Sequence, residues 1–162
     1  MPTPYASYVE SRDPVDMLRV SLDEYRTVSA RLTPALWTRP TAPGKWTVHQ
    51  VVVHVAQWEL IWAVRLRSAL AQPGYVVQPI EQDDLMFETD AVDGPTALAA
   101  FDAVRRMTLA LAASLPPATR EREVRHLALG MIRVEDMLVT MAGHGIHHLR
   151  QLQAVTEDPA QL

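Results

Sequence analysis

The segment VHQVVVHVAQWELIWAVRLRSALA, residues 48–71, decides the fold. Thr47 precedes it and Gln50 lies three positions later, which is the capping-box pattern of a helix N-terminus. Three consecutive valines also suit a strand, but the cap and a helical period that continues through Trp62 favour a helix. Pro73-Gly74 then stops the chain from continuing as a helix. The pattern therefore predicts one long helix over 48–71.

The same kind of periodicity predicts three further helices, each bounded by proline or by a polar connector. Asp13 followed by Pro14 is a typical helix start, and Pro95 falls in the first turn of a later segment. That later segment ends before Pro116-Pro117. These helices are expected at residues 14–32, from about 95 to 115, and from about 134 to 155.

The connection from residue 73 to residue 93 is unusually long and has no sustained period. Neighbouring antiparallel helices need only a few connecting residues, whereas a crossover between opposite ends of a bundle needs this length. We therefore expect an all-α fold, a four-helix bundle with a long crossover between the second and third helices.

Composition indicates one globular domain over residues 1–162, with 48% apolar and 21% charged residues. A net charge of -4 disfavours nucleic acid as a partner. No run of about 18 apolar residues occurs, so we do not expect a membrane as a partner. We expect a cytoplasmic location. The absence of cysteine excludes disulfides and thiolate metal ligands, so a nitrogen-ligated metal must use the six histidines.

The segment HGIHHLRQL in the last predicted helix places His144 and His148 one turn apart on its apolar face. His54 lies on the apolar face of the 48–71 helix. Three neutral imidazoles from two facing helices suit Zn²⁺, Ni²⁺ or Fe²⁺, with positions left for water or substrate. The alternative is a set of core histidines satisfied by side chains or water.

Other polar residues near this pattern receive lesser roles. Gln151 lies nearly in line with His144 and is expected to hydrogen-bond a ligand or a metal-bound water. His147 can replace His148 geometrically but lies off the apolar stripe, so it is expected as a flanking, substrate or subunit contact. His49 and His126 are expected at the surface. Glu59 points too far from His54 to be a ligand, and no general base is identifiable.

Three further features have two interpretations each. Gly143 and Gly145 indicate either space for a ligand or close helix approach. The acidic stretch 81–93 is typical of a solvated loop, the alternative being a lid or a carboxylate donor over the metal end of the bundle. The tryptophans suit a core layer better than a dimer patch. They are Trp37, Trp46, Trp58 and Trp62.

The motifs KWTVHQVVVHVAQWE, residues 45–59, and HGIHHLRQL, residues 144–152, resemble the DinB-like (YfiT-like) family of metal-dependent proteins. The resemblance covers the length and helix order of nearly the whole chain. It implies a bundle with up-down-down-up topology, a homodimer, and a zinc or nickel ion. The ligands would be His54, His144 and His148.

The resemblance also implies functions. The family includes mycothiol-dependent maleylpyruvate isomerases and bacillithiol S-transferases, and the former carry a second domain that is not expected here. We expect a metal-dependent thiol S-transferase or hydrolase acting on a small molecule, and any thiol must come from outside because the chain has no cysteine. The alternatives are a non-catalytic, stress-related dimeric metal-binding protein and a bundle that binds no metal in the cell.

Overall fold

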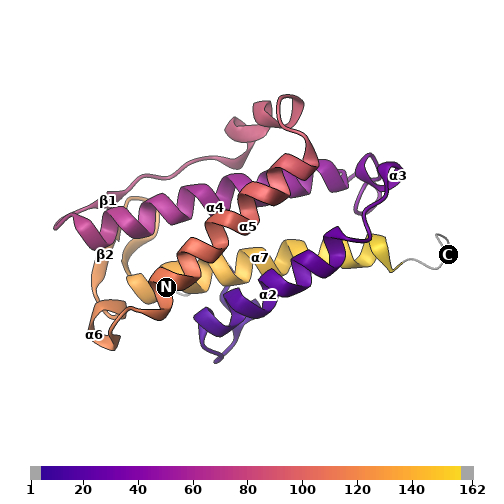
Figure 1. The fold of residues 1–162 in the computed structure, drawn as a ribbon. Coiled ribbons are helices and arrows are strands. Elements are labelled where there is room, and N and C mark those ends of the chain that lie inside the picture. The colour runs from indigo at the N-terminus through magenta and orange to yellow at the C-terminus, as the bar shows by residue number, and fades with distance from the viewer. Residues whose placement is uncertain (1–4, 158–162) are drawn as a thin grey trace.

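The computed structural model describes residues 5–157, in which four long helices pack as a bundle (Figure 1). The long helices are α2 (Pro14–Ser29), α4 (Val48–Ala71), α5 (Gly94–Ala113) and α7 (Val134–Thr156). Short helices lie between or before them: α1 (Ala6–Val9), α3 (Pro34–Trp37), α6 (Pro117–Arg120) and the 3-10 helix η1 (Gln82–Asp90). All four predicted helices are confirmed, and the first ends three residues earlier than expected because Pro34 opens a separate turn.

The four helices have the up-down-down-up arrangement. In Figure 1, α4 and α5 run side by side in one direction, while α2 and α7 run in the other. Two parallel neighbours require a return connection, and residues 72–93 supply it along the side of α4. The long crossover predicted from the sequence is confirmed.

Side-chain caps begin three of the long helices. The carboxylate of Asp13 accepts the Val15 N–H at 2.7 Å. Thr47 and Gln50 form the predicted capping box of α4. The Asp93 side chain accepts the Thr96 N–H at the start of α5.

A small sheet at one end of the bundle was not predicted. It consists of β1 (Val76–Val77), β2 (Glu123–His126) and β3 (Gly130–Arg133), in the order β1-β2-β3. β1 pairs with β2 in parallel, and β2 pairs with β3 as an antiparallel hairpin. Strands of two to four residues are too short to show an alternating pattern in the sequence. The sheet ties the start of the crossover to the segment before α7.

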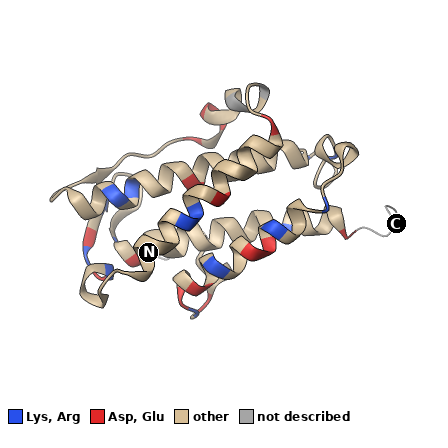
Figure 2. Cartoon of the chain, in the orientation of Figure 1, with Lys and Arg blue, Asp and Glu red and all other residues tan. Residues whose placement is uncertain are grey.

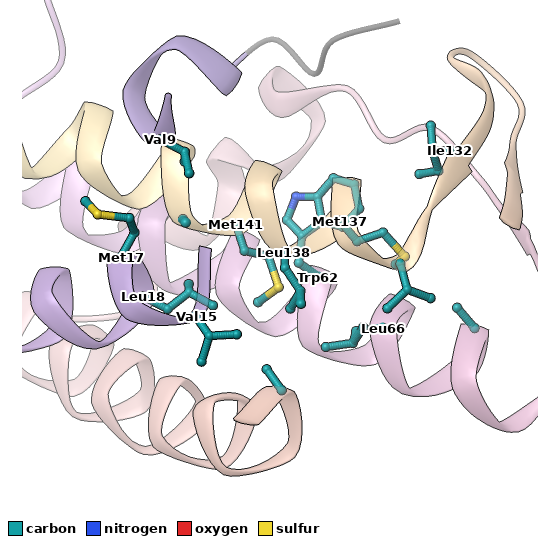
Figure 3. Close-up of a cluster of buried hydrophobic side chains, with 14 of the residues drawn as sticks. Val9, Val15, Met17, Leu18, Trp62, Leu66, Ile132, Met137, Leu138 and Met141 are labelled. Atoms are coloured by element: carbon teal, nitrogen blue, oxygen red, sulfur yellow. The ribbon is translucent and has the colours of Figure 1, made fainter. Parts of the chain in front are cut away.

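One core cluster joins the sheet end of the bundle to the N-terminal segment (Figure 3). Met137, Leu138 and Met141 of α7 lie in it with Trp62 and Leu66 of α4. Figure 3 shows that α1 contributes Val9, α2 contributes Val15, Met17 and Leu18, and β3 contributes Ile132. A second cluster at the other end includes Phe101, Val155 and five of the α4 valines. Burial on both sides of α4 accounts for the valines being helical rather than extended.

An ion pair occupies the interior of the bundle. Arg105 of α5 donates from Nε and Nη2 to the two carboxylate oxygens of Glu59 of α4, at 2.8 and 2.7 Å. Both side chains are at least 97% buried. Nη1 of Arg105 also donates to Ser21 Oγ at 3.1 Å. The neighbouring Val104 is only partly buried, so the charged side chain rather than the apolar one is enclosed at this point of α5.

The remaining charged residues described are mainly exposed and interleaved in sign (Figure 2). Arg26 of α2, for example, pairs with Asp23 on its own helix and with Asp102 on α5. Such exposed pairs contribute little to stability. Among the described residues, no helix is both long enough and apolar enough to cross a membrane.

Candidate metal centre

Three histidines from two helices meet inside the bundle. His54 comes from α4, and His144 and His148 lie one turn apart on α7. One nitrogen from each ring lies within 4.8 Å of the other two. The side chains are 2, 7 and 6% exposed, respectively. The structure thus brings together the three residues that the sequence pattern proposed as metal ligands.

The spacing of the donor atoms suits a divalent metal. His54 Nε2 lies 3.1 Å from His144 Nε2. Two nitrogens bound to one tetrahedral zinc at 2.0–2.1 Å are about 3.3 Å apart. At this distance one neutral ring can donate its N–H to the nitrogen of the other. The third imidazole adds a further nitrogen lone pair, and one cation bound to all three rings would satisfy it.

Burial keeps the three rings neutral. Loss of solvation, followed by repulsion from neighbouring histidines, lowers the pKa of His54 to about 3. Burial lowers the pKa of His148 to about 4, against an opposing effect of its hydrogen bond to Gln151. Burial also lowers the pKa of His144 well below its usual value. Because metals bind the unprotonated ring, all three are ready to bind one at neutral pH without losing a proton.

Gln151 orients one of the candidate ligands. Its Oε1 lies 2.8 Å from His148 Nδ1. An amide oxygen accepts, so Nδ1 carries the proton and the Nε2 lone pair is left for a metal. This contact is the kind of role that the sequence pattern assigned to Gln151.

The N-terminal segment covers the other side of the cluster. The ring of Tyr5 packs edge-on against His144, with 5.2 Å between ring centroids. Tyr8 Oη lies 2.6 Å from Nδ1 of His147, which is half-buried and lines a cavity next to His148. His147 thus lies beside the three-histidine cluster rather than in it. Sequence reasoning missed both tyrosines because they precede the first periodic segment.

The remaining histidines lie outside the cluster. His49 is half-buried, with Nε2 2.8 Å from the Val92 carbonyl oxygen. The prediction that His126 lies at the surface was wrong, because the side chain is only 6% exposed. Its Nδ1 faces the backbone N–H groups of Ala128 and Leu129 in the β2–β3 turn. The missed hairpin explains the error.

Close packing, rather than space for a ligand, accounts for the two glycines beside His144. A Cβ on Gly143 would overlap the backbone oxygen of Tyr5. A Cβ on Gly145 would lie 3.1 Å from Nη2 of Arg105. Of the two interpretations of these glycines, close approach of neighbouring elements is the correct one.

Two cavities of different chemistry border the cluster, and Tyr5 and Gln82 line both. The larger, of about 390 Å³, is mainly polar and reaches His148. Its other polar residues include Thr41, Lys45, Asp83, His147 and Gln151. The smaller, of about 160 Å³, reaches His54 and His144 and is mainly apolar, with Trp58, Trp62 and Leu129 in its wall. The candidate ligands thus separate a polar from an apolar cavity.

The acidic stretch lies along α4, and its described acidic side chains at 81, 83, 84 and 93 are exposed, as a solvated loop requires. Gln57 Nε2 holds it through the Leu85 carbonyl oxygen at 2.8 Å. The side chains of Glu88 and Asp90 lie outside the described residues. Asp83 lines the polar cavity, but the metal-compatible cluster found among the described residues contains no carboxylate.

Comparison with known proteins places this site in a family. The model of the DinB superfamily matches residues 17–152, which include the three histidines and all four long helices in whole or in large part. The chain belongs to the DinB superfamily. The resemblance seen in the two sequence motifs is confirmed.

Relatives of this DinB-superfamily protein include bacterial proteins that bear the name "putative metal-dependent hydrolase". One from Oceanobacillus iheyensis is 26% identical over 69% of this chain and 66% of its own length. One from Geobacillus kaustophilus is 27% identical over 82% of this chain and 76% of its own length. The chain thus spans just under two thirds of the first relative.

The fold is also that of a solved structure. YfiT from Bacillus subtilis, described as "a probable metal-dependent hydrolase with an unusual four-helix bundle topology", matches 88% of this chain and 83% of its own with a TM-score of 0.78. The two sequences are 20% identical, so the likeness establishes the fold alone.

Proposed function

We propose that this protein is a metal-dependent hydrolase of small molecules, with His54, His144 and His148 as the protein ligands of one divalent ion, zinc or nickel before iron. The observation that carries the proposal is the set of three buried, neutral imidazoles converging from α4 and α7 between two cavities. Relatives named as metal-dependent hydrolases support it.

A divalent ion bound by three histidines supplies Lewis acidity and lowers the pKa of water, which provides a nucleophile near neutral pH. The chain's own residues prepare the site for this chemistry. Gln151 holds His148 with Nδ1 protonated, and Tyr5 and Trp46 pack against His144 and His54. These contacts limit rotation of the three imidazole rings.

Metal content is the first test. Natively purified protein should contain about one equivalent of divalent metal, and His144→Ala should contain almost none. His49→Ala is the matched control because His49 lies on α4 but outside the cluster. Full metal content in His144→Ala at unchanged affinity would overturn the ligand assignment.

The reaction is tested with metal-loaded protein and a panel of small esters, amides and phosphoesters. We expect hydrolysis that a chelator abolishes, added metal restores and His144→Ala lacks. Turnover of electrophiles only in the presence of an added low-molecular-weight thiol would overturn hydrolysis in favour of S-transfer. Bound metal without turnover of either kind would favour the non-catalytic alternative.

A further inference from the structure

The smaller cavity has the size and lining of a subsite for an apolar group. Its volume is about 160 Å³, and its mainly apolar lining includes Trp58, Trp62 and Leu129. A cavity of about 150 Å³ lined by apolar side chains is large enough to hold benzene. His54 and His144 form another section of this wall, so a group seated here lies against the candidate ligands.

Neighbouring contacts hold the aromatic section of the wall in place. The guanidinium of Arg65 packs over the rings of Trp58 and Trp62, at 5.6 and 4.8 Å from their centroids. Figure 3 shows Trp62 in the cluster that also contains Met137 and Met141 of α7. A wall fixed in this way need not be ordered when a ligand binds, which favours affinity.

The larger cavity has a polar lining, and this difference from the smaller cavity would orient a bound substrate. Lys45, Asp83 and Gln151 line the larger cavity, and Tyr5 and Gln82 line both cavities. A molecule that places its reacting bond at the three histidines would therefore extend its polar end into the larger cavity and its apolar end into the smaller one.

The β2–β3 hairpin supplies the remaining apolar wall. Leu129 lies in its turn, directly before Gly130, whose φ of 80° favours glycine. Nδ1 of His126 accepts hydrogen bonds from the N–H groups of Ala128 and Leu129, at 3.1 and 3.2 Å. Burial, with a smaller effect of Arg65, lowers the pKa of His126, so the ring is neutral and free to accept at neutral pH. A buried histidine thus fixes the backbone from which Leu129 reaches the cavity.

We propose that this cavity binds a phenyl-sized apolar group of the substrate, and that Leu129, positioned by His126, sets the size of group accepted. The proposal rests on the proposed function for the identity of the metal site. The size limit itself depends only on the cavity wall.

Two small metal-binding probes test the subsite. Acetohydroxamate and phenylacetohydroxamate carry the same metal-binding group, but only the second has a phenyl ring. On zinc-loaded protein, titration calorimetry should show the phenyl compound binding about 10- to 100-fold more tightly, as expected for burial of one phenyl group. Equal affinities for the two probes would overturn the proposal.

Variants locate the effect in the cavity wall. Leu129→Trp fills some of the cavity and should bring the two affinities within about threefold of each other. Leu127→Trp is the matched control, because Leu127 lies in the same turn but is exposed and does not line the cavity. Thr140→Leu fills the cavity from α7 and serves if Leu129→Trp does not fold. A ratio unchanged in the filled variants would overturn the proposal.

The role of His126 requires a separate comparison. His126→Ala should lower the preference for the phenyl probe while leaving affinity for zinc unchanged, and His126→Asn, which keeps a short acceptor, should restore some of it. Equal loss of preference and zinc affinity would indicate a merely structural role.

Failure of the metal site is distinguishable from failure of the subsite. If neither hydroxamate binds zinc-loaded protein better than metal-free protein, the proposed function fails. Toluene binding to the metal-free protein, followed by chemical shift changes, then tests the cavity alone. Wild type should bind toluene and Leu129→Trp should not, and equal binding by both would overturn the subsite.

Discussion

Gly145, the residue after His144, leaves just enough space for the guanidinium of Arg105. A Cβ added at Gly145 would lie 3.1 Å from Nη2. Arg105 in turn holds Glu59 through two hydrogen bonds, and the Gly145 carbonyl oxygen accepts from Tyr25 at 2.8 Å. A polar contact set joining α2, α4, α5 and α7 therefore lies directly beside the candidate metal ligands.

Removing one partner of the buried ion pair should lower the free energy of unfolding far more than removing both partners. Arg105→Met leaves Glu59 charged and unpaired inside the bundle, with an expected loss of about 3–5 kcal/mol in the free energy of unfolding. The double variant Arg105→Met, Glu59→Leu removes both charges and should recover most of this loss. Urea unfolding measures both. Equal losses in the single and double variants would contradict the argument.

The ion pair should also decide the effect of adding a methyl group at Gly145. In the wild-type background, Gly145→Ala gains about 1 kcal/mol in helix propensity, but its Cβ would lie 3.1 Å from Nη2 of Arg105 and strain the hydrogen bonds to Glu59, so we expect a net loss of about 1–2 kcal/mol. In the Arg105→Met, Glu59→Leu background the obstacle is absent and the same change should stabilise. A double-mutant cycle by urea unfolding checks this reversal of sign.

Gly143 should be less tolerant, because there the obstacle is backbone. An alanine at this position would overlap the carbonyl oxygen of Tyr5, which cannot rotate away as a side chain can. We expect Gly143→Ala to displace Tyr5 from His144 and to cost about 1–3 kcal/mol of stability. Loss of the ring-current shifts that Tyr5 produces at His144 would show the displacement by NMR. Unchanged shifts and stability would contradict it.

Gln151 should affect metal affinity without affecting the fold. Gln151→Ala removes the acceptor for His148 Nδ1 and should weaken zinc binding by about 10- to 100-fold. Gln153→Ala is the matched control, since Gln153 lies on the same helix and contacts Glu24 rather than a histidine. Competition with a chelator of known affinity measures both variants. Equal affinities would remove Gln151 from the site.

The main elements of the site could be predicted from the sequence because they follow helical period. His54, His144 and His148 lie on apolar stripes of long helices with clear start and stop signals, and the stripes must face the core. The four helices follow from the same signals. The up-down-down-up order, by contrast, was implied only by the family resemblance, because the length of a connection does not determine which helices pack side by side.

Contacts between distant segments left no such signal. In the sequence pattern of α5, Arg105 belongs to the polar face and is expected to be exposed. Its burial depends on the ion pair with Glu59 of α4, which the sequence does not reveal. Tyr5 reaches His144 from a segment with no period of its own. The β2–β3 hairpin has strands too short for alternation, so the burial of His126 could not be foreseen.

Acid should destabilise the metal-free protein through the histidine cluster. The unfolded chain binds protons at histidine near pH 6.5, whereas His54 and His148 resist protonation in the folded state down to pKa values of about 3 and 4. Across this window the unfolded state binds more protons, so the free energy of unfolding falls as pH falls and the effect is complete only below the folded pKa values.

The size of the acid effect follows from the number of histidines involved. Between pH 7.5 and 5.5, each buried histidine should contribute a loss of about 1.4 kcal/mol, or about 4 kcal/mol for His54, His144 and His148 together. His126 and His147, whose pKa values are also lowered, act in the same direction. Urea unfolding at the two pH values measures the loss, and His54→Gln should reduce it by about 1.4 kcal/mol. Stability that is equal at both pH values would contradict the burial of neutral imidazoles from which the metal site is inferred.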